Sequence, residues 1–117
     1  MEFRIAVKGL ILNQEKVLLV KRSDSDERNP GGLTLPGGFM AFGEKPKEAV
    51  IREVKEETNL DVEVEKVNTV WSFMGKNDNI QIIGITFVCK LLSRDITLNN
   101  ELASFQWVNI DYQSNLN

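Results

Sequence analysis

One segment of this chain has the composition of a helix, and it lies between segments that have the patterns of strands and turns. From about Lys45 to Thr58 there is no internal glycine, while alanine, glutamate, lysine and arginine dominate. Pro46 stands at the start, where the first turn of a helix tolerates proline. Val50, Ile51 and Val54 lie toward one side of this helix and predict the face that packs on a sheet.

The remaining segments predict that sheet. Alternating apolar residues from Phe3 to Val7 and an apolar run from Val17 to Val20 predict two strands joined by a short turn. After the helix, alternating stretches from about 62 to 74 and from 80 to 92 predict a long hairpin, and residues 105 to 108 predict a last short strand. The expected core face of the 80–92 strand consists of Ile83, Ile85, Phe87, Cys89 and Leu91.

Length and composition predict a single globular domain that spans residues 1–117. Hydrophobic residues make up 42% and charged residues 26% of the chain, and turn-forming residues from Ser23 to Gly32 predict an exposed loop. A formal net charge of -3 disfavours a nucleic-acid polymer as partner, and no apolar run is long enough to cross a membrane. Cys89 is the only cysteine, so no internal disulfide can form and a cytoplasmic location is expected.

The chain contains no histidine, and this absence restricts the chemistry that it can perform. Histidine is the commonest general base and a principal zinc ligand, so Ser-His-Asp and Cys-His catalysis are both excluded. Any acid–base or metal chemistry must therefore use carboxylates, whose hard oxygen atoms suit Mg²⁺, Mn²⁺ or Ca²⁺.

Three glutamates share one face of the predicted helix. Glu53, Glu56 and Glu57 stand at i, i+3 and i+4, so they project within an arc about 100° wide. Their mutual repulsion disfavours the cluster on local stability alone, and a divalent cation would reverse the sign of that effect. Taken alone, the same face can also be solvated surface in which Arg52 pairs with Glu48 and Glu56.

The spacing of the residues around these glutamates forms a larger pattern. Gly38 is followed after five residues by Glu44, and seven residues later comes a charged cluster that Leu60 closes. The cluster consists of Arg52, Glu53, Val54, Lys55, Glu56 and Glu57. This pattern resembles the Nudix box, which is Gly, five residues, Glu, seven residues, Arg-Glu-aliphatic-x-Glu-Glu-x-Gly-aliphatic, and the chain meets eight of its nine defined positions. The run from Leu35 to Gly38 and the order of the strands extend the resemblance over most of the chain.

The resemblance implies the Nudix fold, an α+β fold in which an α/β/α sandwich is built around a mixed β-sheet. The chain departs from the family in two ways, at one residue of the box and after the last strand. Asn59 replaces the usual glycine at the left-handed residue that ends the helix, which is a mild change because asparagine is the next best residue there. The usual C-terminal helix is expected to be short or missing, because Tyr112 to Asn117 is short and polar.

The resemblance also implies an enzyme. Nudix hydrolases cut a phosphoanhydride bond in a nucleoside diphosphate linked to another moiety, and they use Mg²⁺, for which Mn²⁺ can substitute. By resemblance, Glu56 and Glu57 are metal ligands, and the Gly37 carbonyl is a further ligand. Glu53 is either a third metal ligand or the base for the attacking water.

Five further residues are expected at this site. Arg52 would hold a carboxylate by charge-assisted hydrogen bonds, and Glu44 would be an accessory ligand or the partner of Arg52. Arg22, at the end of the second strand, is expected to reach substrate phosphates, with a solvated strand end as the alternative. Gly38 is expected where the backbone approaches the substrate closely, although an ordinary tight turn would also use glycine. Glu101 is expected as another metal ligand or base, or else as exposed loop charge.

The box does not encode the substrate. We expect an intact or oxidised nucleoside triphosphate, hydrolysed to a monophosphate and pyrophosphate. ADP-ribose or a nucleotide sugar is the alternative, although residues 75 to 78 carry neither the proline nor the tyrosine that would mark the ADP-ribose and dinucleoside polyphosphate branches. A non-catalytic nucleotide-binding module is a second alternative, although such modules commonly lose box glutamates. The expected partner is thus a small-molecule nucleotide, and a homodimer is compatible with a sheet of many strands.

Overall fold

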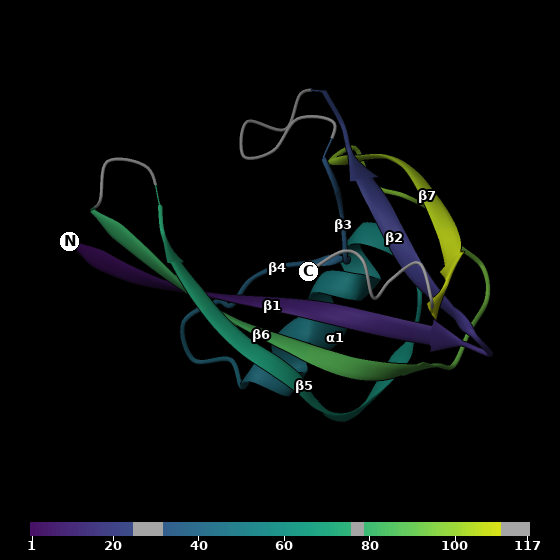
Figure 1. Ribbon diagram of the computed structural model, residues 1–117, viewed down its shortest axis with the longest axis horizontal. Coiled ribbons are helices and arrows are strands. Elements are labelled where there is room, and N and C mark those ends of the chain that lie inside the picture. Colours follow the sequence, from purple (N-terminus) through teal and green to yellow (C-terminus); the bar gives the residue numbers. More distant parts are fainter. Residues whose placement is uncertain (25–31, 76–78, 111–117) are drawn as a thin grey trace.

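The computed structural model describes residues 1–24, 32–75 and 79–110 of the chain. These residues form one helix and a sheet (Figure 1). In chain order the elements are β1 Glu2–Asn13, β2 Lys16–Arg22, β3 Leu33–Thr34, β4 Gly37–Phe39, α1 Pro46–Thr58, β5 Val62–Met74, β6 Ile80–Leu91 and β7 Leu102–Asn109. The predicted helix and long hairpin are confirmed, whereas the first two strands and the last strand are longer than predicted.

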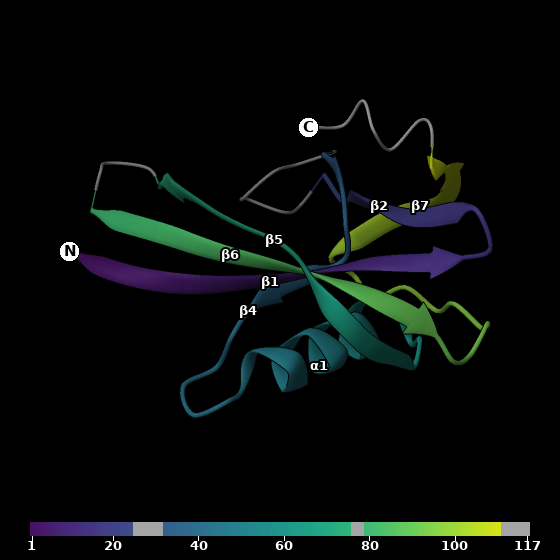
Figure 2. The ribbon, with the colours of Figure 1, turned by 60° about the horizontal axis from the view of Figure 1, so that its bottom comes forward.

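β1 is the central strand of a mixed sheet with the order β3-β2-β1-β6-β5. It runs parallel to β6 and antiparallel to β4. β2 pairs with β1 only next to their shared turn and then continues with β3 and β7. Figure 2 shows α1 on one side of the β1–β6 pair and the β2–β7 pair on the other side. The predicted mixed sheet is confirmed, and α1 is the sole helical layer of the described residues.

The helix packs closely on β1. Val50 and Val54 are fully buried, and a Cβ atom on Gly9 of β1 would lie 3.2 Å from the Val54 Cγ2 atom. The buried cluster around this contact consists of Val7, Ile11, Leu18, Val20, Ala49, Val50, Val54, Leu60, Val62, Phe87, Cys89 and Leu102. Removal of such side chains from water is the dominant favourable term in folding. The packing of Val50 and Val54 against Gly9 therefore fixes the position of α1 on the sheet.

Two residues predicted to be in the core lie elsewhere. Ile51 is 39% exposed, so the prediction that it packs on the sheet is wrong. The helix is rotated so that Ala49 and Glu57 belong to its buried face instead. On β6, Phe87 belongs to the core cluster as predicted, whereas Ile83 is only half-buried and lies outside it. The glutamate face and the buried face of α1 therefore overlap at Glu57.

Some predictions concern segments that lie wholly or largely outside the described residues. These segments are the exposed loop at 23–32, the turn at 75–79 and the polar segment Tyr112–Asn117. Within the residues that the structure describes, no helix is long and apolar enough to span a membrane.

α1 ends at a left-handed residue, as the box alignment predicts. Asn59 has φ of 67° and ψ of 5°, and its N–H donates to the Lys55 carbonyl at 2.9 Å. Its Nδ2 atom also donates to the Asp95 carbonyl at 3.4 Å. Because glycine adopts this conformation without Cβ strain and asparagine tolerates it better than most residues, Asn59 can replace the family glycine.

We predict that Asn59→Gly raises the free energy of unfolding by up to about 0.5 kcal/mol and that Asn59→Ala lowers it by about 1 kcal/mol. The two variants share the loss of the Asp95 hydrogen bond, so they differ mainly in the strain of the left-handed backbone. Urea denaturation measures both effects, and the glycine variant should keep its activity. A glycine variant as unstable as the alanine variant would show that the lost hydrogen bond outweighs the backbone strain.

Candidate active site

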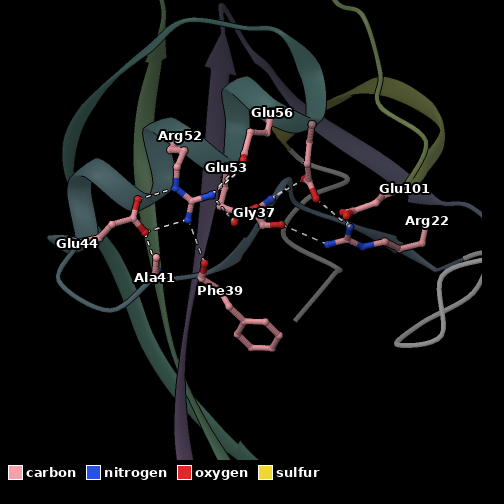
Figure 3. Close-up of polar contacts among 10 residues, drawn as sticks. Arg22, Gly37, Phe39, Ala41, Glu44, Arg52, Glu53, Glu56 and Glu101 are labelled. Carbon is pink, nitrogen blue, oxygen red and sulfur yellow. Dashed lines mark hydrogen bonds and ion pairs between the residues drawn. The ribbon is translucent and has the colours of Figure 1, made fainter.

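The residues predicted for the site come from α1 and from strand ends and loops beside it. The helix contributes Arg52, Glu53, Glu56 and Glu57, and the other segments contribute Arg22, Gly37, Gly38, Glu44 and Glu101. Figure 3 shows the labelled members of this set in one row beside α1, with Glu44 and Arg52 at one end, Gly37 in the middle and Arg22 and Glu101 at the other end. Contacts divide most of them into two groups. The first consists of Arg52, Glu44, Glu53 and Glu56, and the second consists of Glu57, Arg22, Gly37 and Glu101.

Arg52 is the centre of the first group. Its Nε and Nη2 atoms donate to the Glu44 carboxylate at 2.5 and 2.9 Å, and its Nη1 atom donates to Glu53 at 3.0 Å and to Glu56 at 2.6 Å. Its Nη2 atom also donates to the Phe39 carbonyl at 3.2 Å. The hydrogen bond with Glu44 is the largest cause that raises the pKa of Arg52 above its ordinary value. Arg52 therefore fixes the orientation of three carboxylates.

Glu44 is held from two sides. Its carboxylate accepts the hydrogen bonds of Arg52, and its Oε1 atom also accepts the N–H of Ala41 at 2.7 Å. These donors lower the pKa of Glu44 from 4.5 to about 2, with the Arg52 hydrogen bond as the largest cause. This geometry favours the alternative in which Glu44 is the partner of Arg52 over the alternative in which it is an accessory metal ligand.

Glu57 is the buried centre of the second group. Its side chain is 1% exposed, its Oε1 atom accepts the Gly37 N–H at 2.9 Å, and its Oε2 atom accepts Arg22 Nη1 at 2.9 Å. Arg22 Nη2 donates to the Gly37 carbonyl at 3.4 Å, and Glu101 Oε2 lies 3.9 Å from Arg22 Nη1. The alternative of a solvated strand end is wrong for Arg22, because its side chain is 5% exposed.

Gly37 and Gly38 lie where other groups closely approach the backbone of a strand. A Cβ atom on Gly37 would collide with the Val7 carbonyl oxygen of β1, and a Cβ atom on Gly38 would collide with the Glu53 carboxylate. The tight-turn alternative is wrong, because both glycines lie in β4 and pair with β1. The absence of these side chains lets the Glu53 carboxylate lie directly on the backbone of β4.

The three helix glutamates differ in exposure across their shared face. The side chain of Glu57 is 1% exposed, that of Glu53 is 16% exposed and that of Glu56 is 51% exposed. Burial raises the pKa of Glu53 above its ordinary value, although the charge of Arg52 opposes this effect. One face of α1 therefore carries three different carboxylates: Glu57 is buried, Glu53 is half-buried with a raised pKa, and Glu56 faces solvent.

The oxygen atoms of the site suit a hard divalent cation in their chemistry. They belong to the Gly37 carbonyl and to the carboxylates of Glu53, Glu56 and Glu57. Each is bound to an arginine, since Arg22 contacts the Gly37 and Glu57 oxygens while Arg52 contacts the other two. In the ranges 1–24, 32–75 and 79–110, no group of three or more acidic, histidine or cysteine side chains could hold a metal ion as it stands. The donors fit a hard divalent cation, and in this structure two guanidinium groups contact them.

Two backbone groups of the site are not predicted from the sequence. They are the Phe39 carbonyl, which accepts from Arg52, and the Ala41 N–H, which donates to Glu44. Because every residue carries such groups, residue type gives no signal for them. Their position between Gly38 and Glu44 of the box is the one available indication.

We predict that Glu44→Gln lowers stability at neutral pH and that this difference shrinks in acid. The folded-state pKa of Glu44 is about 2, below its ordinary 4.5. The ionised carboxylate therefore contributes stability above about pH 4.5, and this contribution is lost as pH falls toward about 2. Urea denaturation of both proteins between neutral pH and about pH 3 measures the difference.

Glu15→Gln is the matched control for that comparison, because it removes an exposed carboxylate from the turn between β1 and β2. This control should show little stability change at neutral pH. A Glu44→Gln difference that stays constant from neutral to acid pH would contradict the role of the ionised carboxylate.

Comparison with known proteins places this site in a family. The model of the NUDIX domain matches residues 2–113. An ADP-ribose pyrophosphatase of Methanocaldococcus jannaschii is 31% identical over 107 residues, and the match covers 92% of this chain and 62% of that protein. A nucleoside triphosphatase NudI of Escherichia fergusonii is 33% identical over 118 residues, with 92% of this chain and 83% of that protein covered.

A solved structure agrees with the sequence match. The crystal structure of the MutT protein from Methanosarcina mazei Go1 superposes with a TM-score of 0.85 at 31% identity, covering 94% of this chain and 79% of that one. The family match includes every site residue described above, from Arg22 to Glu101. With its box spacing, its mixed sheet and its helix in place, this chain belongs to the NUDIX domain family.

Proposed function

We propose that the chain catalyses Mg²⁺-dependent hydrolysis of a phosphoanhydride bond in a nucleoside diphosphate linked to another moiety. The proposed substrate is an intact or oxidised nucleoside triphosphate, which gives a monophosphate and pyrophosphate. One observation carries the proposal: two of the three helix glutamates lie against β4, with Glu57 held by the Gly37 N–H and Glu53 lying against Gly38, while Arg52 holds Glu56 beside Glu53. Diphosphate hydrolysis needs neutralised oxygens, a positioned water and a stabilised leaving group, and a divalent cation held by such a carboxylate cluster would supply all three.

The proposed metal ligands lie on both sides of the β4–α1 contact. Mg²⁺, with Mn²⁺ as a substitute, would be held by Glu56, Glu57 and the Gly37 carbonyl, and Glu53 or Glu101 would complete the set. Bound there, the ion would neutralise phosphate oxygens and lower the pKa of a bound water. The Gly37 N–H keeps the Glu57 carboxylate beside the Gly37 carbonyl, which supports joint binding by these two groups.

Glu53 is the proposed base when it is not a ligand. Its carboxylate lies against Gly38, it is half-buried, and its pKa is raised, all of which favour proton uptake. The attacking water gives its proton to a Glu53 carboxylate oxygen while its own oxygen bonds to phosphorus. The bridging P–O bond then breaks, and the leaving phosphate carries its electron pair away. Arg52 would keep Glu53 and Glu56 oriented, and Glu44 would hold Arg52 in place.

The proposed substrate contacts are Arg22 and Gly38. Gly38 would border the substrate because its lack of a side chain leaves the backbone of β4 accessible beside Glu53. Arg22 would bind substrate phosphates through its guanidinium. That contact requires Arg22 to leave Glu57 and Gly37, with which it is paired here.

A second candidate substrate class is ADP-ribose or a nucleotide sugar, and the similarity to an ADP-ribose pyrophosphatase favours it. The chain spans less than two thirds of that relative, so this candidate takes second place. A third candidate is a non-catalytic nucleotide-binding module. It is disfavoured because all four box glutamates are present, namely Glu44, Glu53, Glu56 and Glu57.

The proposed setting is the cytoplasm, with a small-molecule nucleotide as partner and neither a nucleic-acid polymer nor a membrane. The single cysteine supports this setting, because Cys89 is a free thiol buried in the core and no internal disulfide can form. A homodimer is the proposed assembly, supported by apolar side chains left exposed on the edge strand β5, which are Val67, Val70, Phe73 and Met74.

We predict Mg²⁺-dependent turnover in a panel of dNTPs, oxidised dNTPs, ADP-ribose, nucleotide sugars and dinucleoside polyphosphates, with the highest kcat/KM for a triphosphate. Glu53→Gln and Glu57→Gln should each lower kcat by about 100-fold or more, because they remove a ligand or a base. Phosphate or pyrophosphate release measures the rates.

Glu48→Gln is the matched control, because Glu48 lies on the same helix and a glutamine preserves its capping contact with the Lys45 N–H. This control should leave the rate within about twofold. Equal rates in wild type and Glu57→Gln would contradict the metal assignment. If no substrate turns over with Mg²⁺ or Mn²⁺, the nucleotide-binding module becomes the better proposal.

A further inference from the structure

The Arg22 guanidinium lies where three of the proposed metal donors converge. Its Nη1 atom is 2.9 Å from Glu57 Oε2 and 3.9 Å from Glu101 Oε2, and its Nη2 atom is 3.4 Å from the Gly37 carbonyl oxygen. These donors come from three separate segments, which are α1, the loop before β7 and β4. Figure 3 shows Arg22 reaching between Gly37 and Glu101. A cationic side chain thus stands among oxygens of the kind that bind a divalent cation.

The contact with Glu57 compensates a buried charge. The side chains of Glu57 and Arg22 are 1% and 5% exposed, so water solvates neither group well. Removing one partner of such a buried pair leaves an uncompensated charge and is strongly destabilising. Some cation must therefore accompany the ionised Glu57 carboxylate, and in this structure it is Arg22.

We propose that Arg22 and a divalent cation compete for the same oxygens, so that Arg22 must leave Glu57 and Gly37 when the ion binds. This inference rests on the proposed function, because it takes the Glu57 and Gly37 oxygens as metal ligands. Mg²⁺ binds oxygens at about 2.0–2.1 Å, and its two positive charges at that distance would repel a guanidinium that contacts the same oxygens. The doubly charged ion then takes over the compensation of Glu57, and the Arg22 Nη atoms become available to phosphate oxygens.

The backbone around Arg22 allows this exchange through the side chain alone. The Arg22 N–H donates to the Gly32 carbonyl at 2.8 Å, and the Ser23 N–H donates to the Glu101 carbonyl at 2.9 Å. The main chain is thus held at both residues, and the exchange that we propose is a rotation of the arginine side chain. Arg22 also stands at a register irregularity in the pairing of β2 with β7, where the ladder is locally interrupted.

Arg52 is bound in a different way. It also contacts two proposed metal ligands, Glu53 and Glu56, but its shortest bond goes to Glu44, which is not among the metal ligands proposed above. Glu44 and the Phe39 carbonyl hold Arg52 whether or not the helix glutamates change partners. Arg52 is therefore a permanent positioning residue, and Arg22 is the exchangeable cation.

Calorimetric titration with Mg²⁺ alone tests the competition. We predict that Arg22→Gln binds Mg²⁺ about tenfold more tightly than wild type, because binding no longer has to break the buried ion pair. Arg22→Lys, which keeps a charge but fewer donors, should lie between them. Lys21→Gln removes the same charge from the neighbouring exposed position and is the matched control, so its affinity should stay within about twofold of wild type.

Thermal unfolding gives a readout that does not depend on activity. Without Mg²⁺, Arg22→Gln should unfold about 10 °C below wild type, because Glu57 loses its counter-charge. Saturating Mg²⁺ should raise the unfolding temperature of Arg22→Gln by more than that of wild type, since the ion supplies the missing charge.

A measurement on wild type keeps the proposal testable if the variants do not fold. In nitrogen-15 NMR spectra, Mg²⁺ should shift the Arg22 side-chain resonance and speed the exchange of its protons with water. The Arg4 resonance is the internal control, because Arg4 pairs with Glu2 on β1. An Arg22 resonance that stays unchanged at saturating Mg²⁺ overturns the proposal.

The outcomes separate this inference from the proposed function. Equal or weaker Mg²⁺ binding by Arg22→Gln overturns the competition, while the proposed function still stands if wild type hydrolyses its substrate with Mg²⁺. If wild type binds no Mg²⁺ in the calorimeter, both the metal assignment and the competition are wrong. Tighter binding by Arg22→Gln with an unchanged Lys21→Gln control supports the competition.

Discussion

Burial of the Glu57 carboxylate is the interaction on which the layout of the site depends. Because a buried charge must be compensated, the chain brings the Gly37 N–H from β4 and the Arg22 guanidinium from β2 to this one side chain. The backbone of the same helix turn is also held, since the Asn99 N–H donates to the Glu57 carbonyl and the Thr97 N–H donates to the Thr58 carbonyl. A single residue of α1 thus ties the helix to two strands and to the segment before β7.

The charges of the site are balanced within the protein. From the sequence, three glutamates on one helix face predict repulsion that a divalent cation would relieve. In the structure, Arg52 already binds Glu53 and Glu56, and Arg22 binds Glu57. Guanidinium groups therefore relieve the repulsion in this structure. A metal ion that replaces them would have to stabilise the carboxylates by more than these groups do. This balance explains how a folded chain can hold so acidic a cluster on one face.

The sequence predicts much of this structure because much of its information is local. Helix composition and strand alternation place α1 and the long hairpin, the box spacing brings Glu44, Arg52 and the three helix glutamates to one predicted site, and Asn59 ends the helix as expected. The rotation of α1 is not local, since it is set by the approach of Val50 and Val54 to Gly9. For this reason the exposure of Ile51 and the burial of Glu57 are not predicted. The Arg22–Glu57 pair is missed for the same reason, because its partners are 35 residues apart in the sequence.

The parallel pairing of β1 with β6 also determines when the site can form during folding. Its first pair joins Glu2 to Ile80, and every site residue except Glu101 lies in the chain between them. Closing so long a loop costs entropy and slows folding, and pairing between distant parallel strands forms late. The helix can coil early with Arg52 beside Glu53 and Glu56, but Glu57 has no partners until β2 and β4 stand beside α1. Catalytic competence is therefore a cooperative property of the closed sheet, and an isolated box segment would lack it.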